Sequence, residues 1–343
     1  MTNENRTEKK PTTNEWQLLY KAAEAFKQVK PWKWLFDQDL ICVQNPENGE
    51  TGYCSIMGRG GEHYALGVFL GDSGLAKFLA LAADNGEIPQ HEIVHYQDCI
   101  MGSFDDREFV GKRDMEVIKS LGLKFRGSNE WPVFRRFEPG YFPWEITDEE
   151  CRFLTCAFEQ ALFVANVVKA GEVDVDFENG GSILRKKEPK TGQWISEELQ
   201  LPFLTETYNP LLVNNADLIK ELKKARKVEG LQISIDVTYC PTPIGEKNIR
   251  PYFSRIFLIA EEKSGQMMKY KMYDDKDEDV DTVMNNLIDF VFNFGIPQKI
   301  NVRTEKMMNI YGDICKQLGI KLNLKLKLPL IEEFLKGLDD RMR

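Results

Sequence analysis

The sequence predicts a chain of two domains, an α+β domain followed by an α/β domain. The chain has 343 residues, more than a single hydrophobic core usually fills. A stretch of loop-like composition at 201–210 separates two halves whose apolar residues follow different patterns. In the second half, three strand patterns precede alternating helices and strands, in the order βββαβαβα. We therefore expect a disordered N-terminus at 1–13, a first domain at 14–205 and a second domain at 206–343.

The first domain is expected to combine helices with short strands. A first helix at 16–29 should end before Pro31, because the residue that precedes a proline is pushed out of the helical region. Apolar spacing and turn residues indicate further elements: strands at 40–43, 52–57 and 63–70, helices at 75–83 and 113–121, and a hairpin around 189–192.

The clearest helix of the first domain begins after Thr147. The Thr147 hydroxyl can accept a hydrogen bond from the amide of Glu150, whose side chain can reach back to the Thr147 amide. Apolar residues then recur at helical spacing through 153–168. The helix should therefore run to Ala170 and end at Gly171.

The second domain has a more regular pattern. Residues 231–239 alternate between apolar and polar side chains, which is typical of a half-buried strand. Thr304 favours a helix start and Gly319 a helix end, so a helix is expected between them. The other expected elements are helices at 217–227, 280–294 and 330–338 and strands at 255–260, 267–272, 299–302 and 321–328.

Four segments of the second half carry a resemblance: "ISIDVTYCP", "EEKSGQM", "FGIPQKINV" and "LGIKLNLKL". With the order βββαβαβα, they resemble the ribonuclease H-like fold of retroviral-type integrases and transposases. The resemblance covers roughly 231–340 and implies a ribonuclease H-like second domain. Chemistry in that superfamily needs clustered carboxylates, because two divalent ions must be held about 4 Å apart.

The resemblance places candidate catalytic acids at Asp236, Glu305 and Glu332. Asp236 matches the aspartate of the first strand, and Glu332 or Glu333 matches the final acid in the last helix. Where the family has its middle aspartate, this chain has Arg303 and Thr304, and Glu305 follows one step later. If these acids are functional, the resemblance implies Mg²⁺ or Mn²⁺; otherwise no cofactor is expected.

The same acids also have an ordinary structural interpretation. Asp236 would lie on the polar face of a strand, Glu305 would complement the positive end of a helix, and Glu332 would be solvated. Because fold resemblance does not transfer function and the acid set is incomplete, we favour a degenerate, non-catalytic domain.

The whole chain is also similar to an uncharacterised bacterial family with two domains of unknown function. In the first half, this resemblance rests on "VKPWKWL", "LGLKFRG" and "WPVFRRFEPGYFPWEIT". It extends over nearly the full length and implies no assigned reaction.

Residues 91–95, "HEIVH", match the His-Glu-x-x-His pattern of zinc peptidases. In that pattern an α-helix brings His91 and His95 onto one ion, and Glu92 activates the water. A third ligand is needed, and the nearest helical carboxylate is Glu116. The alternative is a pair of surface or strand histidines, which we favour.

Residues 123–145 are the densest cluster of aromatic and arginine residues. They could form a binding surface that stacks on bases or grips a peptide. The alternative, which we favour, is a proline-stiffened connection whose aromatic side chains pack onto the helix after Thr147. The candidate binding residues are Arg126, Trp131, Arg135, Tyr141 and Trp144.

Composition limits the partners and the compartment. The formal charge of −9 disfavours nonspecific binding to nucleic acid or anionic membranes, so such binding would need a local cationic patch. Residues 1–13 carry no secretory signal pattern, and seven scattered cysteines without a C-x-x-C pair indicate a reducing compartment. The longest apolar stretch, 151–168, contains Glu159, Gln160 and Asn166, so no transmembrane segment is expected.

We therefore expect a bacterial cytoplasmic protein that binds or scaffolds without catalysing a reaction. A divalent-metal nuclease or related phosphoryl transferase is the first alternative, and a zinc hydrolase at the HEIVH motif is the second. The partner stays open: a protein is one option, nucleic acid is disfavoured by the charge, and no membrane partner is expected.

Overall fold

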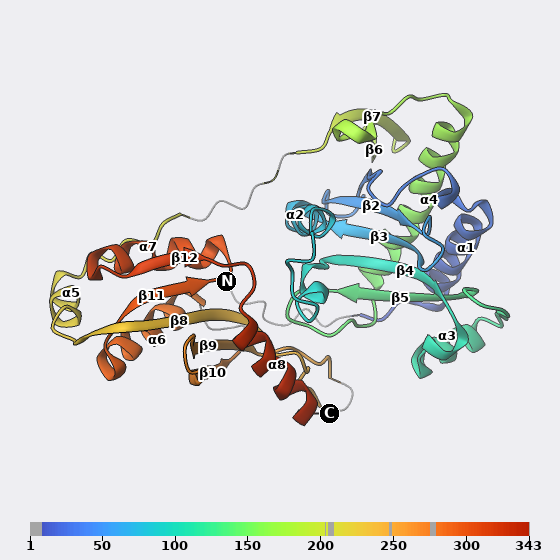
Figure 1. The fold of residues 1–343 in the computed structure, drawn as a ribbon. Coiled ribbons are helices and arrows are strands. Elements are labelled where there is room, and N and C mark those ends of the chain that lie inside the picture. The colour runs from blue at the N-terminus through green and yellow to red at the C-terminus, as the bar shows by residue number, and fades with distance from the viewer. Residues whose placement is uncertain (1–8, 203, 205–208, 247–248, 275–278, 343) are drawn as a thin grey trace. The chain divides into compact units, whose positions relative to one another are not determined.

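The computed structural model describes residues 9–202, 204, 209–246, 249–274 and 279–342, and they form two compact units (Figure 1). The first unit contains the described residues of 1–83, 94–139 and 143–205, and the second contains those of 84–93, 140–142 and 206–343. Each unit combines one sheet with helices, which confirms a two-domain chain of mixed helices and strands.

The second unit therefore includes two short segments from the first half of the chain. Backbone hydrogen bonds attach the later of these segments: the Phe142 amide donates to the Pro251 carbonyl at 2.9 Å, and the Phe253 amide donates to the Gly140 carbonyl at 2.7 Å. A single boundary near residue 205 does not describe this arrangement, because residues 140–142 pair with residues 251 and 253, which lie far along the chain.

The predicted disorder at 1–13 lies largely outside the described residues, which begin at Lys9. From there the chain is ordered. The Thr12 side chain accepts a hydrogen bond from the Glu15 amide, and the Glu15 carboxylate accepts one from the Thr12 amide at 2.7 Å. This capping box starts the first helix at Thr13, three residues earlier than the apolar pattern indicated.

The first unit is built on a seven-stranded sheet with the order β5-β4-β3-β2-β1-β6-β7. Neighbouring strands are antiparallel, except that β1 and β6 are parallel. The strands are β1 (Ile41–Gln44), β2 (Thr51–Met57), β3 (Tyr64–Leu70), β4 (Cys99–Asp105), β5 (Trp131–Phe137), β6 (Gly181–Lys187) and β7 (Trp194–Gln200).

Helices cover the two faces of this sheet unequally (Figure 1). Helices α1 and α4 pack together in the main core on one face, and α2 packs on the other. The α-helices are α1 (Thr13–Val29), α2 (Gly71–Ala82), α3 (Lys112–Ser120) and α4 (Asp148–Ala170); the short 3₁₀ helices are η1 (Pro31–Lys33), η2 (Ile93–Tyr96), η3 (Arg107–Phe109) and η4 (Phe177–Asn179).

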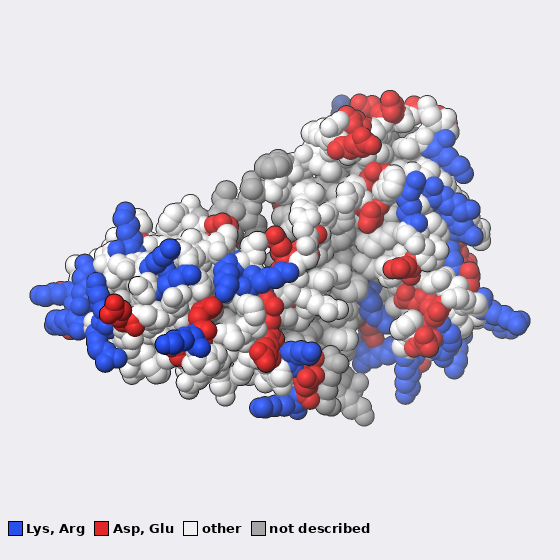
Figure 2. All heavy atoms as spheres, in the orientation of Figure 1, with Lys and Arg blue, Asp and Glu red and all other residues white. Residues whose placement is uncertain are grey.

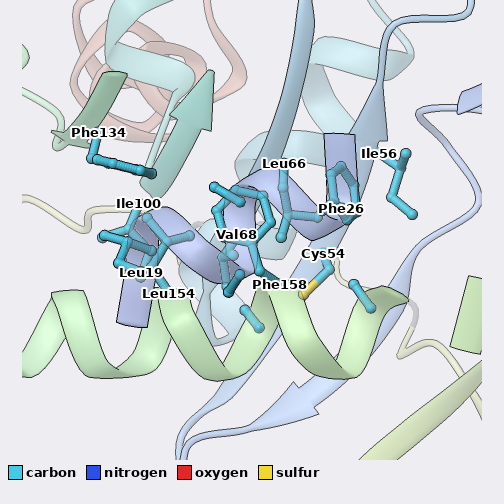
Figure 3. Close-up of a cluster of buried hydrophobic side chains, with 14 of the residues drawn as sticks. Leu19, Phe26, Cys54, Ile56, Leu66, Val68, Ile100, Phe134, Leu154 and Phe158 are labelled. Atoms are coloured by element: carbon cyan, nitrogen blue, oxygen red, sulfur yellow. The ribbon is translucent and has the colours of Figure 1, made fainter. Parts of the chain in front are cut away.

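Helix α4 has the predicted ends, with the capping box of Thr147 and Glu150 at its start and Gly171 at its end. Within the described residues it is the one helix long and apolar enough to cross a membrane, and half of its apolar window is buried. Figure 3 shows Leu154 and Phe158 of α4 among side chains of α1 and the sheet. This packing makes α4 a core helix of the first unit.

Strand β5 was not expected from the sequence. In β5, Pro132 and the adjacent Arg135 and Arg136 obscure the alternating pattern, so 123–145 was interpreted as a connection. Strand β5 is nevertheless fully paired with β4, from Trp131 opposite Asp105 to Phe137 opposite Cys99. Because β5 is an edge strand, Pro132 is tolerated there: proline has no backbone N–H, and no further strand needs one.

The second unit contains a five-stranded sheet with the order β10-β9-β8-β11-β12. Strands β8, β9 and β10 are successively antiparallel, β11 is parallel to β8, and β12 is parallel to β11. The elements are α5 (Ala216–Leu222), β8 (Lys227–Tyr239), β9 (Arg255–Glu261), β10 (Met267–Tyr273), α6 (Asp279–Phe294), β11 (Ile296–Val302), α7 (Glu305–Leu318), β12 (Lys321–Leu324) and α8 (Pro329–Met342).

The two faces of this sheet differ in chemistry. On one face, Ile233 and Ile235 of β8 pack into a core with residues of α5, α6 and α7. On the other, α8 covers the apolar residues of β9, including Ile256 and Leu258. The predicted strand at 321–328 is too long, because the chain leaves the sheet after Leu324 to bury Leu328 under α8.

Charged side chains of both signs lie over the visible surface of each unit, and Lys and Arg gather at the end of the second unit that carries α5 (Figure 2). Exposed Lys220, Lys223 and Lys224 belong to this end, together with Arg226 and Lys227. The chain thus carries a local cationic patch despite its net charge of −9.

A substitution in β4 tests the close packing of α4 on the sheet. A Cβ added at Gly102 would lie 2.6 Å from Cζ of the fully buried Phe158. We expect Gly102→Ala to lower the free energy of unfolding by about 1–3 kcal/mol, the usual cost of overpacking a core. Gly60→Ala, where a Cβ meets nothing within 4 Å, is the control. Equal urea midpoints for the two variants would contradict this packing.

Candidate functional site

Strand β8 carries a row of buried polar residues on the face that α8 partly covers. Ser234, Asp236 and Thr238 alternate with the apolar residues of the opposite core, and all three are buried. The parallel pairing of β8 with β11 sets Asn301 beside Ser234, and Arg303 directly follows β11. Two adjacent strands therefore bring a set of polar side chains together.

Asp236 and Arg303 form a buried ion pair. Asp236 is 1% exposed, and its Oδ2 lies 2.8 Å from Nε and 2.7 Å from Nη2 of Arg303. Nη1 of the same guanidinium lies 3.3 Å from Oε1 of Glu332 on α8. The guanidinium thus links two of the three acids that the sequence proposed as catalytic.

Electrostatics at this pair are set mainly by the loss of water. Burial raises the pKa of Asp236, while the Arg303 guanidinium favours the charged form and the nearby Glu92 carboxylate opposes it. The backbone amide of Val237 donates to Oδ1 of Asp236 at 3.0 Å and also supports the carboxylate.

Residues of the HEIVH motif contact the same strand. The Glu92 carboxylate accepts hydrogen bonds from the Thr238 hydroxyl and, at 2.8 Å, from the Tyr239 amide. Nε2 of His91 lies 2.9 Å from the Thr238 oxygen. Because the single hydroxyl proton of Thr238 goes to Glu92, His91 is the donor in that contact. These bonds attach segment 84–93 to the second unit.

Protein groups also satisfy the Ser234 end of the row. The Ser234 hydroxyl donates to the Glu262 carboxylate, which accepts from Asn301 Nδ2 at 3.1 Å and pairs with Lys325 at 3.3 Å. Burial opposes ionisation of Glu262, but the hydrogen bonds from Ser234, Lys325 and Asn301 outweigh it and lower its pKa. This carboxylate is held charged by its neighbours.

The third proposed acid does not join the cluster. Glu305 is the exposed first residue of α7. Glu333, the alternative to Glu332 as the final acid, is exposed on α8. Within the described part of the chain, no group of three or more His, Cys, Asp or Glu side chains is placed to hold a metal ion.

The HEIVH segment does not form the α-helix that a zinc site of this type requires. His91 lies in a turn, and Ile93–Tyr96 forms the short 3₁₀ helix η2. The division between the units also falls inside the motif, with His91 in the second unit and the buried His95 in the first. The sequence match therefore lacks its structural context.

The aromatic and arginine residues of 123–145 do not form one surface. Arg135 is held by Asp114 through contacts of 2.8 and 2.6 Å, and Trp131 packs 5.9 Å from Phe125 between ring centres. Trp144 pairs with Arg136 by backbone hydrogen bonds, while Arg126 is exposed in a loop. Tyr141 belongs to the second unit, where the Arg250 guanidinium lies 4.9 Å from its ring centre.

Sequence reasoning missed the roles of Arg303, Glu92 and Thr238. The alternation of β8 could have placed Thr238 on the face of Asp236, and a parallel neighbour could have placed Arg303 beside it. The contact of Glu92 with Thr238 spans 146 residues, and no local pattern indicates it.

Removing Arg303 should reveal how strongly Asp236 depends on it. We expect Arg303→Met to lower the free energy of unfolding by about 3–5 kcal/mol, because it leaves a buried carboxylate without its partner. The double variant Asp236→Leu, Arg303→Met should recover part of this loss. Lys325→Met, which removes a more exposed ion pair, should cost less than about 1 kcal/mol. Denaturant unfolding of the wild type, Arg303→Met, Asp236→Leu, the double variant and Lys325→Met checks the coupling; a loss in the double variant equal to the sum of the two single losses would disprove it.

His91 should make stability depend on pH. Burial and then the Arg303 charge lower the pKa of His91 below its ordinary value of 6.5. The folded state therefore binds fewer protons than the unfolded state, so stability falls as the pH drops below the unfolded pKa. Melting temperatures from pH 8 to about 5 should fall less for His91→Gln than for the wild type. A His63→Gln control, at an exposed position, should follow the wild type.

Comparison with family models finds two matches. Residues 16–211 match a domain of unknown function (DUF7309), and residues 218–339 match a domain of unknown function (DUF6930). No curated protein and no solved structure matches the chain. The expected similarity to a family with two domains of unknown function is thus confirmed. Because the first match covers more than half of the 343 residues, the chain belongs to the DUF7309 family, with a DUF6930 domain following in the same chain.

Proposed function

We propose that this chain is a non-catalytic binding or scaffolding protein of the bacterial cytoplasm. Its second unit is a degenerate ribonuclease H-like domain, and its partner is a protein. The observation that carries the proposal is the buried ion pair of Asp236 with Arg303 at the place where the resemblance requires a second acid.

The topology of the second unit supports the fold assignment. Three successive antiparallel strands, β8 to β10, are extended on the other side of β8 by the parallel strands β11 and β12. Asp236 lies on the central strand β8, as the first-strand aspartate of the resemblance does. The segments that carry the sequence resemblance fall on these strands.

The side chains around Asp236 do not fit a pair of divalent cations. Such ions need several carboxylate oxygens free to coordinate them, whereas the Arg303 cation engages Asp236 and also contacts Glu332. Glu305 is exposed and outside the cluster. Because a cation of the protein itself occupies the position between the acids, we derive no catalytic step here.

The cysteines support the proposed compartment. All seven are free, and every one except Cys156 is buried. Burial raises the pKa of Cys54 and Cys99, which keeps these thiols protonated and unreactive. Buried free thiols are the usual state of cysteine in a reducing compartment.

A metal titration with a cleavage assay tests the proposal. We expect no thermal shift of the full chain with Mg²⁺, Mn²⁺ or Zn²⁺ and no cleavage of labelled DNA or RNA. Bound metal at a hundred times its dissociation constant would stabilise the chain by about 2.7 kcal/mol, which is measurable.

Two matched variants identify an opposing result. Manganese-dependent cleavage that Asp236→Asn abolishes and Glu159→Gln, at an exposed position of the first unit, retains would overturn the proposal in favour of a nuclease. A zinc-dependent shift that the double variant His91→Ala, His95→Ala abolishes would instead favour a hydrolase at the HEIVH motif.

A further inference from the structure

One face of the sheet in the first unit is only partly covered by a helix. Helix α2 packs over β2 and β3, and next to it the surface over β4 and β5 is hollowed into a groove of about 580 Å³. This volume lies within the range of about 300–1,000 Å³ that small-molecule sites occupy. The whole groove is lined by residues of the first unit.

The floor of the groove is apolar and adaptable. A Cβ added at Gly67 of β3 would lie 2.9 Å from Cε of Met57 and 3.6 Å from Cε of Met101. Two methionine side chains therefore occupy the space that the glycine leaves. Methionine is unbranched and polarisable, so such a floor can fit apolar ligands of different shapes.

Aromatic rings form the walls. Phe69 and Phe78 pack with their ring centres 4.7 Å apart, and Phe137 of β5 also lines the groove. Phe109, in η3, lines it too and is 67% exposed. The faces of aromatic rings carry negative potential and attract organic cations.

The polar groups of the groove leave an excess of negative charge. Its one arginine, Arg135, is already paired with Asp114 through two contacts. Asp37 and Asp105 also line the groove; Asp105 interacts electrostatically with Arg135, but neither carboxylate lies within ion-pair distance of a Lys or Arg of the described chain. The Ser103 hydroxyl donates to Asp105 at 2.8 Å and holds that carboxylate in place.

We propose that this groove binds a small organic cation, a protonated amine that carries an aromatic or branched aliphatic group. The ammonium pairs with Asp105, and the apolar group lies on the methionine floor between the phenylalanine rings. This site is separate from the Asp236 cluster and stands whether or not the second unit is catalytic.

Calorimetric titration of the full chain with tryptamine tests the site, with indole-3-propionate as a probe that has the same ring system and the opposite charge. Tryptamine should bind, and indole-3-propionate should bind at least about tenfold more weakly. Asp105→Asn keeps an acceptor for Ser103 and should weaken tryptamine binding about tenfold. Glu159→Gln removes an equal charge from an exposed position on α4. No residue of α4 lines the groove, so this variant should leave the affinity unchanged.

Three results would overturn the proposal: no heat of binding for tryptamine at about 5 mM, equal affinities for the two probes, or equal effects of Asp105→Asn and Glu159→Gln. If Asp105→Asn melts below the wild type, Asp37→Asn takes its place. Asp37→Asn should also lower the affinity for tryptamine, and it should not lower the affinity for indole-3-propionate.

Discussion

The ion pair between Asp236 and Arg303 is the constraint on which the second unit depends. A carboxylate without water on the central strand is costly unless a cation reaches it with good geometry. Because β11 lies directly beside β8, the guanidinium of Arg303, which follows the last residue of β11, reaches this carboxylate. Glu92 and Glu332 add negative charge around one arginine. The cluster is therefore rich in acid around a single guanidinium.

The elements that local chemistry determines could be predicted from the sequence. The capping box of Thr147 predicted the start of α4, and strict alternation identified residues 231–239, the C-terminal part of β8. Strand β5 was missed because its arginines and proline look like a loop until β4 provides a partner. The alternating leucines of 321–328 predicted a strand over the whole segment, but β12 ends at Leu324 because the chain leaves the sheet to bury Leu328.

The candidate site was predictable only in part. The resemblance directed attention to Asp236 and Glu332, and the arginine at 303 was visible as a departure from the expected acid. No sequence pattern indicated which residues contact each other in the cluster, because Glu92 and Thr238 are 146 residues apart in the sequence. The favoured interpretation of the HEIVH motif, a pair of surface or strand histidines, was wrong, because His91 lies in a turn and the buried His95 lies in a short 3₁₀ helix. Long-range hydrogen bonds, rather than helical periodicity, give its residues their neighbours.

The placement of 84–93 and 140–142 in the second unit has a consequence for how the chain is made. During synthesis these short segments leave the ribosome before β8. Their partners in the second unit are therefore not yet present when the first unit can begin to fold. Until the C-terminal half emerges, the Glu92 carboxylate lacks the two donors from β8, the Thr238 hydroxyl and the Tyr239 amide. Conversely, a fragment beginning after residue 205 would carry a Thr238 hydroxyl and a Tyr239 amide with no carboxylate to receive them. The second unit is thus completed only by residues from the first half of the chain.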